Sequence, residues 1–146
     1  ADPDLRLQSH PGEISRAMLT QIEGMIAKIQ WGKRDIAEFA GRYLSEPKPN
    51  VFFDAPEALL GRAAFNKQAN RHGVALNPKS RLLFAGGRFF INGEAFTPAA
   101  DETTALKHLA DQRHLAPPLP AALRERLYDW YEAGWLEISA NTPKTA

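Results

Sequence analysis

A stripe of apolar side chains at helical spacing constrains the beginning of this chain most strongly. Within residues 15–29 the apolar residues recur every three or four positions, which places them on one face of an α-helix. A chain that starts in this way is expected to bury that helix against other elements. The stripe consists of Met18, Leu19, Ile22, Met25, Ile26 and Ile29.

A second helix is expected directly after the first. The apolar spacing recurs over residues 33–44, and Pro47 and Pro49 forbid its continuation. The connection at Trp31-Gly32 is short, so we expect the two helices to pack antiparallel.

A third helical region is expected to begin near Pro56, with Asp54 as its cap, and to end at Gly73, with a break at Gly61 as an alternative to one continuous helix. The three helices together predict a small all-α unit over residues 1–73.

The second half of the chain predicts short strands. Two apolar segments, residues 81–85 and 88–96, flank Gly86-Gly87, a pair that suits a tight β-hairpin turn. Alternation along the second strand separates Phe89 from Phe90, so at least one of these rings is expected in the core rather than stacked on nucleic-acid bases.

Two helices and a strand are expected to follow the hairpin. Asp101 or Thr103 suits the N-cap of the first helix, and the second lies between Pro120 and Gly134, followed by a strand over residues 135–138. The order ββααβ is typical of a winged-helix-like unit, here over residues 74–140, with residues 141–146 as a tail. The predicted fold class is α+β, mainly α.

The net charge of +1 hides an uneven distribution. No Asp or Glu lies between Ala58 and Gly93, so every charged residue of this segment is basic. It predicts either a surface for RNA or another acidic partner, or a solvated face paired with acids from the flanking segments. Its charged residues are Arg62, Lys67, Arg71, Lys79, Arg81 and Arg88.

The sequence offers no catalytic, cofactor-binding or metal-binding residues. It has no cysteine, which excludes thiolate chemistry, and its four histidines are scattered without a His-x-Asp or His-x-Glu pair. No serine lies in a Gly-x-Ser-x-Gly turn. The apolar stretches are also too short to cross a membrane and no signal segment opens the chain, so we expect a cytoplasmic protein.

The apolar stripe favours a homodimer. A small helical unit cannot bury every apolar face within one chain, so we expect a second copy to cover the stripe. The alternative is that the stripe is buried inside the monomer. The predicted dimer interface consists of Met18, Ile22, Met25, Ile26 and Ile29.

Five short strings in one order carry a family resemblance. They are Tyr-Leu-Ser-Glu-Pro-Lys at 43–48, Ser-Arg-Leu-Leu at 80–83, Phe-Ile-Asn-Gly-Glu at 90–94, Leu-Ala-Asp-Gln-Arg at 109–113 and Trp-Tyr-Glu-Ala-Gly-Trp-Leu at 130–136. With these strings the chain resembles the C-terminal part of the bacterial cupin/JmjC-type ribosomal oxygenases, the ribosomal-protein arginine hydroxylases.

The resemblance implies an accessory role within a longer enzyme. Such enzymes use Fe(II) and 2-oxoglutarate, held by a catalytic β-helix, to hydroxylate a ribosomal protein. This chain lacks that domain, so no catalytic residue carries over and the chain alone is expected to be inactive. Its implied roles are dimerisation and the positioning of the catalytic domain or the substrate.

An alternative is a free-standing dimeric winged-helix protein that binds nucleic acid. A helix that reads bases should display several basic or amide side chains on one face. The helix near Leu123 instead mixes Arg124 and Arg126 with Glu125, Asp129 and Glu132, which does not favour base reading.

Overall fold

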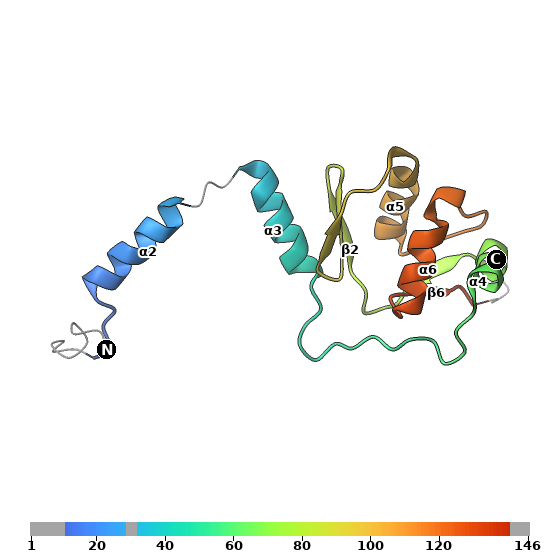
Figure 1. The fold of residues 1–146 in the computed structure, drawn as a ribbon, viewed down its shortest axis with the longest axis horizontal. Coiled ribbons are helices and arrows are strands. Elements are labelled where there is room, and N and C mark those ends of the chain that lie inside the picture. The colour runs from blue at the N-terminus through green and yellow to red at the C-terminus, as the bar shows by residue number, and fades with distance from the viewer. Residues whose placement is uncertain (1–10, 29–31, 141–146) are drawn as a thin grey trace. The chain divides into compact units, whose positions relative to one another are not determined.

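The computed structural model describes residues 11–28 and 32–140, and it confirms an α+β fold that is mainly helical (Figure 1). The chain divides into two compact units, residues 1–35 and residues 36–146. In chain order the elements are α2 (Arg16–Lys28), α3 (Lys33–Ser45), α4 (Arg62–His72), β1 (Val74–Leu76), β2 (Leu82–Ala85), β3 (Arg88–Ile91), β4 (Glu94–Phe96), α5 (Ala100–Gln112), β5 (His114–Leu115), the 3-10 helix η1 (Ala121–Leu123), α6 (Arg124–Glu132) and β6 (Leu136–Ile138).

Helix α2 is the described element of the first unit and lies where the apolar stripe predicts it. The hydroxyl of Ser15 accepts a hydrogen bond of 3.1 Å from the backbone N–H of Met18, which caps the helix at its first turn. Ile29 and Trp31 lie outside the described residues, so the antiparallel packing of the first two helices stays a prediction.

One sheet of the second unit has the strand order β5-β1-β6, and its pairs are antiparallel. Val74 pairs with Leu115 on one side and with Ile138 on the other. Strands β1 and β5 were not expected, because segments of three and two residues are too short to show a sequence pattern.

The second sheet has the order β2-β3-β4. Its first hairpin turns at Gly86-Gly87 as predicted, with Gly86 at φ 59°. The single strand expected over residues 88–96 is wrong, because Asn92 and Gly93 adopt φ of 47° and 90° and turn the chain back on itself. The Asn92 side chain stabilises this turn, since its Oδ1 accepts a hydrogen bond of 2.9 Å from the backbone N–H of Arg81.

Helix α4 belongs to the core of the second unit rather than to a separate helical unit. The Phe65 ring packs against the rings of Tyr128 and Tyr131, with centroids 5.5 and 4.6 Å apart. Phe65 and Ala69 are buried with the residues of β1, α5 and α6. Helix α4 therefore packs with elements that lie beyond the domain boundary expected near Gly73.

The start of α4 also differs from the prediction. The helix begins at Arg62 after Gly61, and neither Asp54 nor Pro56 lies in it. Two tyrosine hydroxyls of α6 hold the preceding backbone, because Tyr131 accepts from the N–H of Leu60 at 3.1 Å and Tyr128 donates to the carbonyl of Leu60 at 2.9 Å. These long-range bonds fix Leu60 outside the helix.

Helix α5 begins earlier than predicted, because its N-cap residue lies two residues before Asp101 and four before Thr103. Ala99 is the residue before the helix, and its N–H donates to Oε1 of Glu102 at 3.1 Å. Neither Asp101 nor Thr103 acts as the N-cap. The side chain of Glu102 reaches back to the backbone N–H of Ala99, which is the contribution of the N3 glutamate to a capping box.

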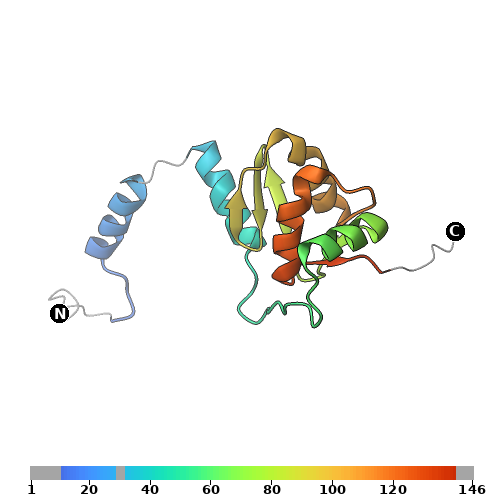
Figure 2. The same cartoon turned by 45° about the vertical axis from the view of Figure 1, so that its right-hand side comes forward.

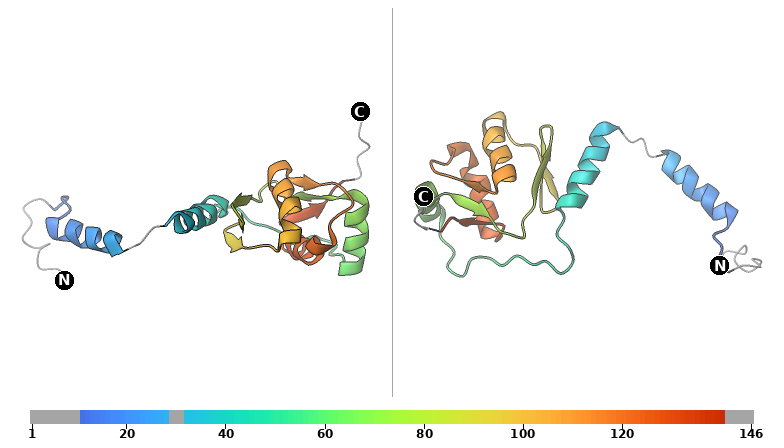
Figure 3. Two further views of the ribbon diagram at one scale, coloured as in Figure 1. Left: turned by 90° about the horizontal axis from the view of Figure 1, so that it is seen from above. Right: turned by 180° about the vertical axis from the view of Figure 1, so that it is seen from behind.

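Helix α3 packs on the β2-β3-β4 sheet, on the side opposite α5 (Figures 1 and 2). The same order of α3, sheet and α5 is seen from behind in Figure 3. The contact is close because Gly41 has no side chain, and a Cβ atom there would overlap the ring of Phe90. Phe89 and Phe90 are both buried, which confirms that these aromatic rings pack in the protein rather than lie open for base stacking.

Candidate interaction sites

Helix α2 has an exposed apolar face. Met18 and Ile22 are 41% and 42% exposed, and Met25 and Ile26 are 61% and 58% exposed. No described residue of the first unit covers this face. These are four of the five residues predicted to form a dimer interface, and the fifth, Ile29, lies outside the described residues.

Helix α3 has a second apolar face. Ile36, Phe39 and Tyr43 are all more than half exposed and follow one another at helical spacing. The rings of Phe39 and Tyr43 stack with centroids 6.0 Å apart and planes at 9°. The opposite side of the helix, with Gly41 and Ser45, is buried. The sequence pattern alone did not separate these two sides.

An ion-pair network joins α3 to the second sheet. Oε1 of Glu38 accepts hydrogen bonds from Arg88 at 3.0 Å and from Arg42 at 3.2 Å. The hydrogen bond from Arg88, followed by that from Arg42, lowers the pKa of Glu38 below its ordinary value. This network and the Gly41–Phe90 contact fix α3 on the sheet while its apolar face stays exposed.

The six basic residues that we singled out lie on α4, on β3 and in the loop between β1 and β2. Arg62 pairs with Glu125 at 3.1 Å and Arg88 pairs with Glu38 at 3.0 Å. Lys79 donates to the carbonyl of Phe52, and Arg81 donates to the carbonyl of Leu44 at 3.2 Å. Two of the six charges are thus paired with acids from flanking segments, which was the alternative to a free basic surface.

Lys67 and Arg71 differ from the other four. Both are exposed on α4 and are spaced four residues apart, so they lie on one face of the helix. Neither forms an ion pair or a side-chain hydrogen bond with any residue in the described part of the chain. Of the predicted basic surface, they are the two cations whose side chains are not engaged by another described residue.

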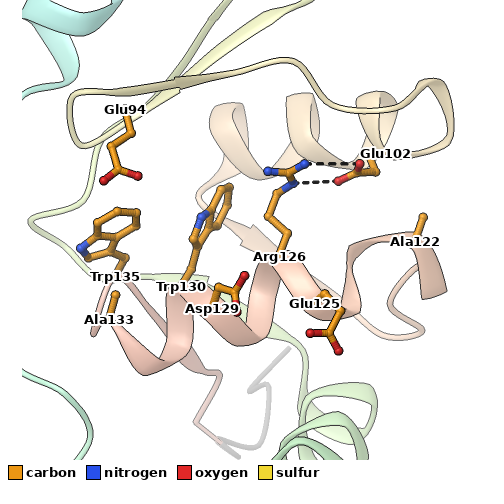
Figure 4. A pocket seen from close by; sticks show the side chains of 9 residues that line it. All are labelled: Glu94, Glu102, Ala122, Glu125, Arg126, Asp129, Trp130, Ala133 and Trp135. Atoms are coloured by element: carbon orange, nitrogen blue, oxygen red, sulfur yellow. Dashed lines mark hydrogen bonds and ion pairs between the residues drawn. The ribbon is translucent and has the colours of Figure 1, made fainter.

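A pocket of about 510 Å³ lies where β4, α5 and α6 meet (Figure 4). Sequence reasoning missed it, because its residues are distant in the chain and only the packing of α5 on α6 brings them together. We call it the acidic pocket, and it is lined by Glu94, Glu102, Ala122, Glu125, Arg126, Asp129, Trp130, Ala133 and Trp135.

The charges of the acidic pocket are only partly compensated. Glu102 forms two hydrogen bonds with Arg126, the shorter of 2.8 Å, and the pKa of Glu102 is lowered mainly by that guanidinium. Glu125 pairs with Arg62. Glu94 and Asp129 form no ion pair with any described residue, so two uncompensated carboxylates line the pocket.

The face of α6 does not favour base reading in the structure either. Two of its charged side chains are already engaged in ion pairs, Arg126 with Glu102 and Glu125 with Arg62. Among the residues that the structure describes, Arg124 is the one basic side chain of α6 without such a partner.

The described residues contain no group of three or more His, Cys, Asp or Glu side chains that could hold a metal ion. The residues present therefore do not fit an iron centre within residues 11–28 and 32–140. Over the same ranges, no helix is long and apolar enough to cross a membrane.

Solved structures of a ribosomal oxygenase share this fold. YcfD from Escherichia coli matches with a TM-score of 0.64 at 18% sequence identity, over 96% of this chain and 40% of that chain. Its complex with cobalt and 2-oxoglutarate matches with a TM-score of 0.62 at 18% identity, over 94% and 39% of the two chains. The chain therefore spans about 40% of the length of these relatives.

No curated protein sequence matches the chain. A family model described as ROXA-like winged helix matches residues 24–137. That range includes α3 and the elements of the second unit up to all but the last residue of β6, and the match confirms the resemblance that the five sequence strings carry. Because the model covers most of the sequence, this chain belongs to the ROXA-like winged-helix family.

Proposed function

We propose that this chain is the non-catalytic accessory part of a cupin/JmjC-type protein hydroxylase that depends on Fe(II) and 2-oxoglutarate and acts on a ribosomal protein. Membership of the ROXA-like winged-helix family supports this proposal, as does the fold shared with YcfD. In this proposal a catalytic domain outside the chain supplies the oxidation chemistry and holds both cofactors. The chain itself supplies dimerisation and positioning, and the protein works in the cytoplasm, where ribosomes are.

The observation that carries the accessory role is the two-sided character of α3. Gly41 and Glu38 attach one side of the helix to the second sheet, whereas Ile36 and Tyr43 on the other side are exposed. A helix fixed in this way presents its apolar face at a constant orientation to the winged-helix core. A second copy that binds this face would hold two winged-helix units in a fixed relation.

The apolar face of α2 is a second surface that a partner copy could cover. An isolated amphipathic helix of 13 residues is marginally stable in water, so an exposed apolar stripe gains most from burial against a partner. In a two-fold symmetric dimer each face meets the same face of the other copy or the neighbouring helix of that copy. Both arrangements cover the predicted interface residues.

Dimerisation is tested by light scattering coupled to size-exclusion chromatography over a range of concentrations. We expect a dimer that dissociates in the Ile22→Glu/Ile26→Glu variant and in the Ile36→Glu/Tyr43→Glu variant, because each buries two charges in an apolar contact. Thr20→Glu/Ala27→Glu is the matched control, since both positions lie on the opposite side of α2. A wild-type chain that stays monomeric would contradict the role, as would variants that remain dimeric.

The substrate class is tested in cells. Deletion of the gene that encodes this chain should remove one oxygen atom from a ribosomal protein, measured by intact-protein mass spectrometry, and re-expression should restore it. Ribosomal proteins of unchanged mass would contradict the proposed hydroxylase.

We also propose that Lys67 and Arg71 contact ribosomal RNA. Binding through these residues should weaken steeply as salt rises, because phosphate contacts release counterions. Lys67→Ala/Arg71→Ala should then abolish binding of a ribosomal RNA fragment in a fluorescence-anisotropy titration. Negligible binding by the wild-type chain at low ionic strength would remove this part.

A further inference from the structure

We propose that the acidic pocket binds an extended peptide segment of a partner protein that carries a Lys or Arg side chain. The inference rests on the pocket alone and does not depend on the proposed hydroxylase. The pocket combines an excess of negative charge, an unused hydrogen-bond donor and two indole rings, and each points to a different part of the same ligand.

The excess of carboxylates in the pocket favours a positively charged ligand. Four carboxylates line it against a single guanidinium, that of Arg126. Arg126 is engaged by Glu102, and Glu125 is engaged by Arg62 from α4. Glu94 and Asp129 come from β4 and α6, respectively, and they remain available for a positively charged group.

Trp130 adds a donor that has no acceptor. Its side chain lines the pocket although the residue is only 5% exposed. No described residue accepts a hydrogen bond from its indole N–H. In Figure 4 the ring nitrogen of Trp130 lies on the side of the ring that faces Trp135. A buried N–H in this position requires an acceptor from a ligand or from water, and a peptide carbonyl provides one.

The two indole rings give the cation an aromatic surface. Figure 4 shows the carboxylate of Glu94 above the ring of Trp135, with Trp130 beside it. Tryptophan is the side chain that attracts ammonium and guanidinium groups most strongly through its ring face. A Lys or Arg side chain that reaches Glu94 therefore passes along an indole, which adds to the attraction of the carboxylate.

The pocket is built before any ligand arrives. The backbone N–H of Trp135 donates to the backbone carbonyl of Trp130 at 2.9 Å, and this bond fixes the backbone from which the two indoles project. Gly134 between them has φ 81° and lies against the carbonyl of Asp54, so this turn has little freedom. On the other side, the Arg126 guanidinium lies 4.4 Å from the centroid of Phe96 while it binds Glu102. Preorganised groups of this kind lose little entropy on binding.

Two other ligand classes fit less well. Nucleic acid is repelled by the excess of carboxylates. A polyamine satisfies the carboxylates but carries no acceptor for the Trp130 N–H. A basic peptide satisfies both, because its backbone carbonyls accept while its side chains are cationic.

The test is isothermal titration calorimetry with a short blocked peptide that alternates Arg with Gly. We expect saturable binding that weakens roughly tenfold in Glu94→Gln/Asp129→Asn, because two charge contacts with the peptide are lost together. Asp111→Asn/Glu137→Gln is the matched control: it removes the same charge from exposed positions outside the pocket and should leave the affinity within about twofold. Trp130→Phe keeps an aromatic ring but removes the N–H, and should weaken binding about fivefold.

The comparison ligands decide between specific recognition and general attraction. The peptide with citrulline in place of Arg, which keeps the shape without the charge, should not bind measurably. Spermidine should bind more weakly than the peptide and should be insensitive to Trp130→Phe. Equal losses in the pocket variant and the matched control would overturn the proposal, as would equal affinity for the citrulline peptide or tighter binding of an RNA oligonucleotide. Thermal unfolding of each variant verifies that it is folded at the assay temperature.

Discussion

The hydroxyl of Ser45 accepts a hydrogen bond of 3.0 Å from the backbone N–H of Gly93. This bond joins the last residue of α3 to the turn between β3 and β4. The Ser45 hydroxyl also donates to the carbonyl of Arg42 at 3.3 Å, and Ser45 is completely buried. Two of the strings that carry the family resemblance, residues 43–48 and 90–94, therefore meet in space and hold each other in place.

Ser45→Ala should destabilise the second unit by about 1–2 kcal/mol. The substitution removes the acceptor of the half-buried Gly93 N–H, so the hydrogen bond is lost and water compensates for it only in part. Urea unfolding followed by circular dichroism measures the change. Thr104→Ala on the exposed side of α5 is the control and should shift stability by at most about 0.5 kcal/mol. Equal midpoints for both variants would show that the Ser45–Gly93 bond contributes little.

Gly41→Ala should destabilise the packing of α3 although alanine is the better helix former. Helix propensity alone favours alanine by about 1 kcal/mol, whereas the added Cβ overlaps the buried Phe90 ring and costs about 1–3 kcal/mol. Hydrogen exchange of the α3 amides should increase.

Gly24→Ala in α2 is the matched control, because a Cβ there meets nothing within 4 Å. It should leave exchange in α3 unchanged and slow exchange in α2. Phe90→Val in the Gly41→Ala background should recover part of the loss by making room. Unchanged α3 exchange in Gly41→Ala would contradict the close approach.

Gly134→Ala should be more damaging than Gly86→Ala. Both glycines have positive φ, 81° and 59°, so both substitutions cost about 1–2 kcal/mol of backbone strain. A Cβ at Gly86 meets nothing within 4 Å, whereas a Cβ at Gly134 overlaps the carbonyl of Asp54. The difference between the two thermal unfolding midpoints therefore isolates the steric overlap, and similar midpoints would show that the Asp54 segment moves aside.

The Glu102–Arg126 pair should make stability depend on pH in the acid range. Arg126 lowers the pKa of Glu102 in the folded state below its ordinary value of 4.5, which applies to the unfolded chain. A lowered folded-state pKa means that the contribution is fully present above 4.5 and is lost as pH falls through the folded-state value. Glu102→Gln should remove that part of the acid sensitivity in urea midpoints measured from neutral to acid pH. Asp101→Asn, at the exposed neighbouring position, should retain it.

The sequence by itself determined the local elements. Apolar residues at intervals of three and four predicted α2, α3, α5 and α6 close to their observed positions, because this spacing matches the period of a helix with one apolar face. The glycine pair at residues 86–87 predicted the hairpin, because positive φ is nearly free of strain only for glycine. These properties depend on neighbouring residues alone.

Only the tertiary structure decided which elements share a core. The start of α4 is set by the hydroxyl groups of Tyr128 and Tyr131, which lie about 70 residues away from Leu60 in the sequence. The residues next to Leu60 therefore do not predict where the helix begins. Strands β1 and β5 exist because sheet partners complete their hydrogen bonds, not because their few residues favour extended backbone.

The same distinction separates the two kinds of site. The apolar face of α2 is readable from spacing, since helical periodicity places its residues together. The acidic pocket is not, because Glu94, Glu102 and Asp129 come from three elements that only packing brings together. Charge on the linear sequence shows a basic middle segment, whereas the folded chain pairs Arg62 and Arg88 with distant acids and leaves its uncompensated carboxylates around two indoles. Coulombic interaction depends on distance in space, so the fold decides which charges remain available.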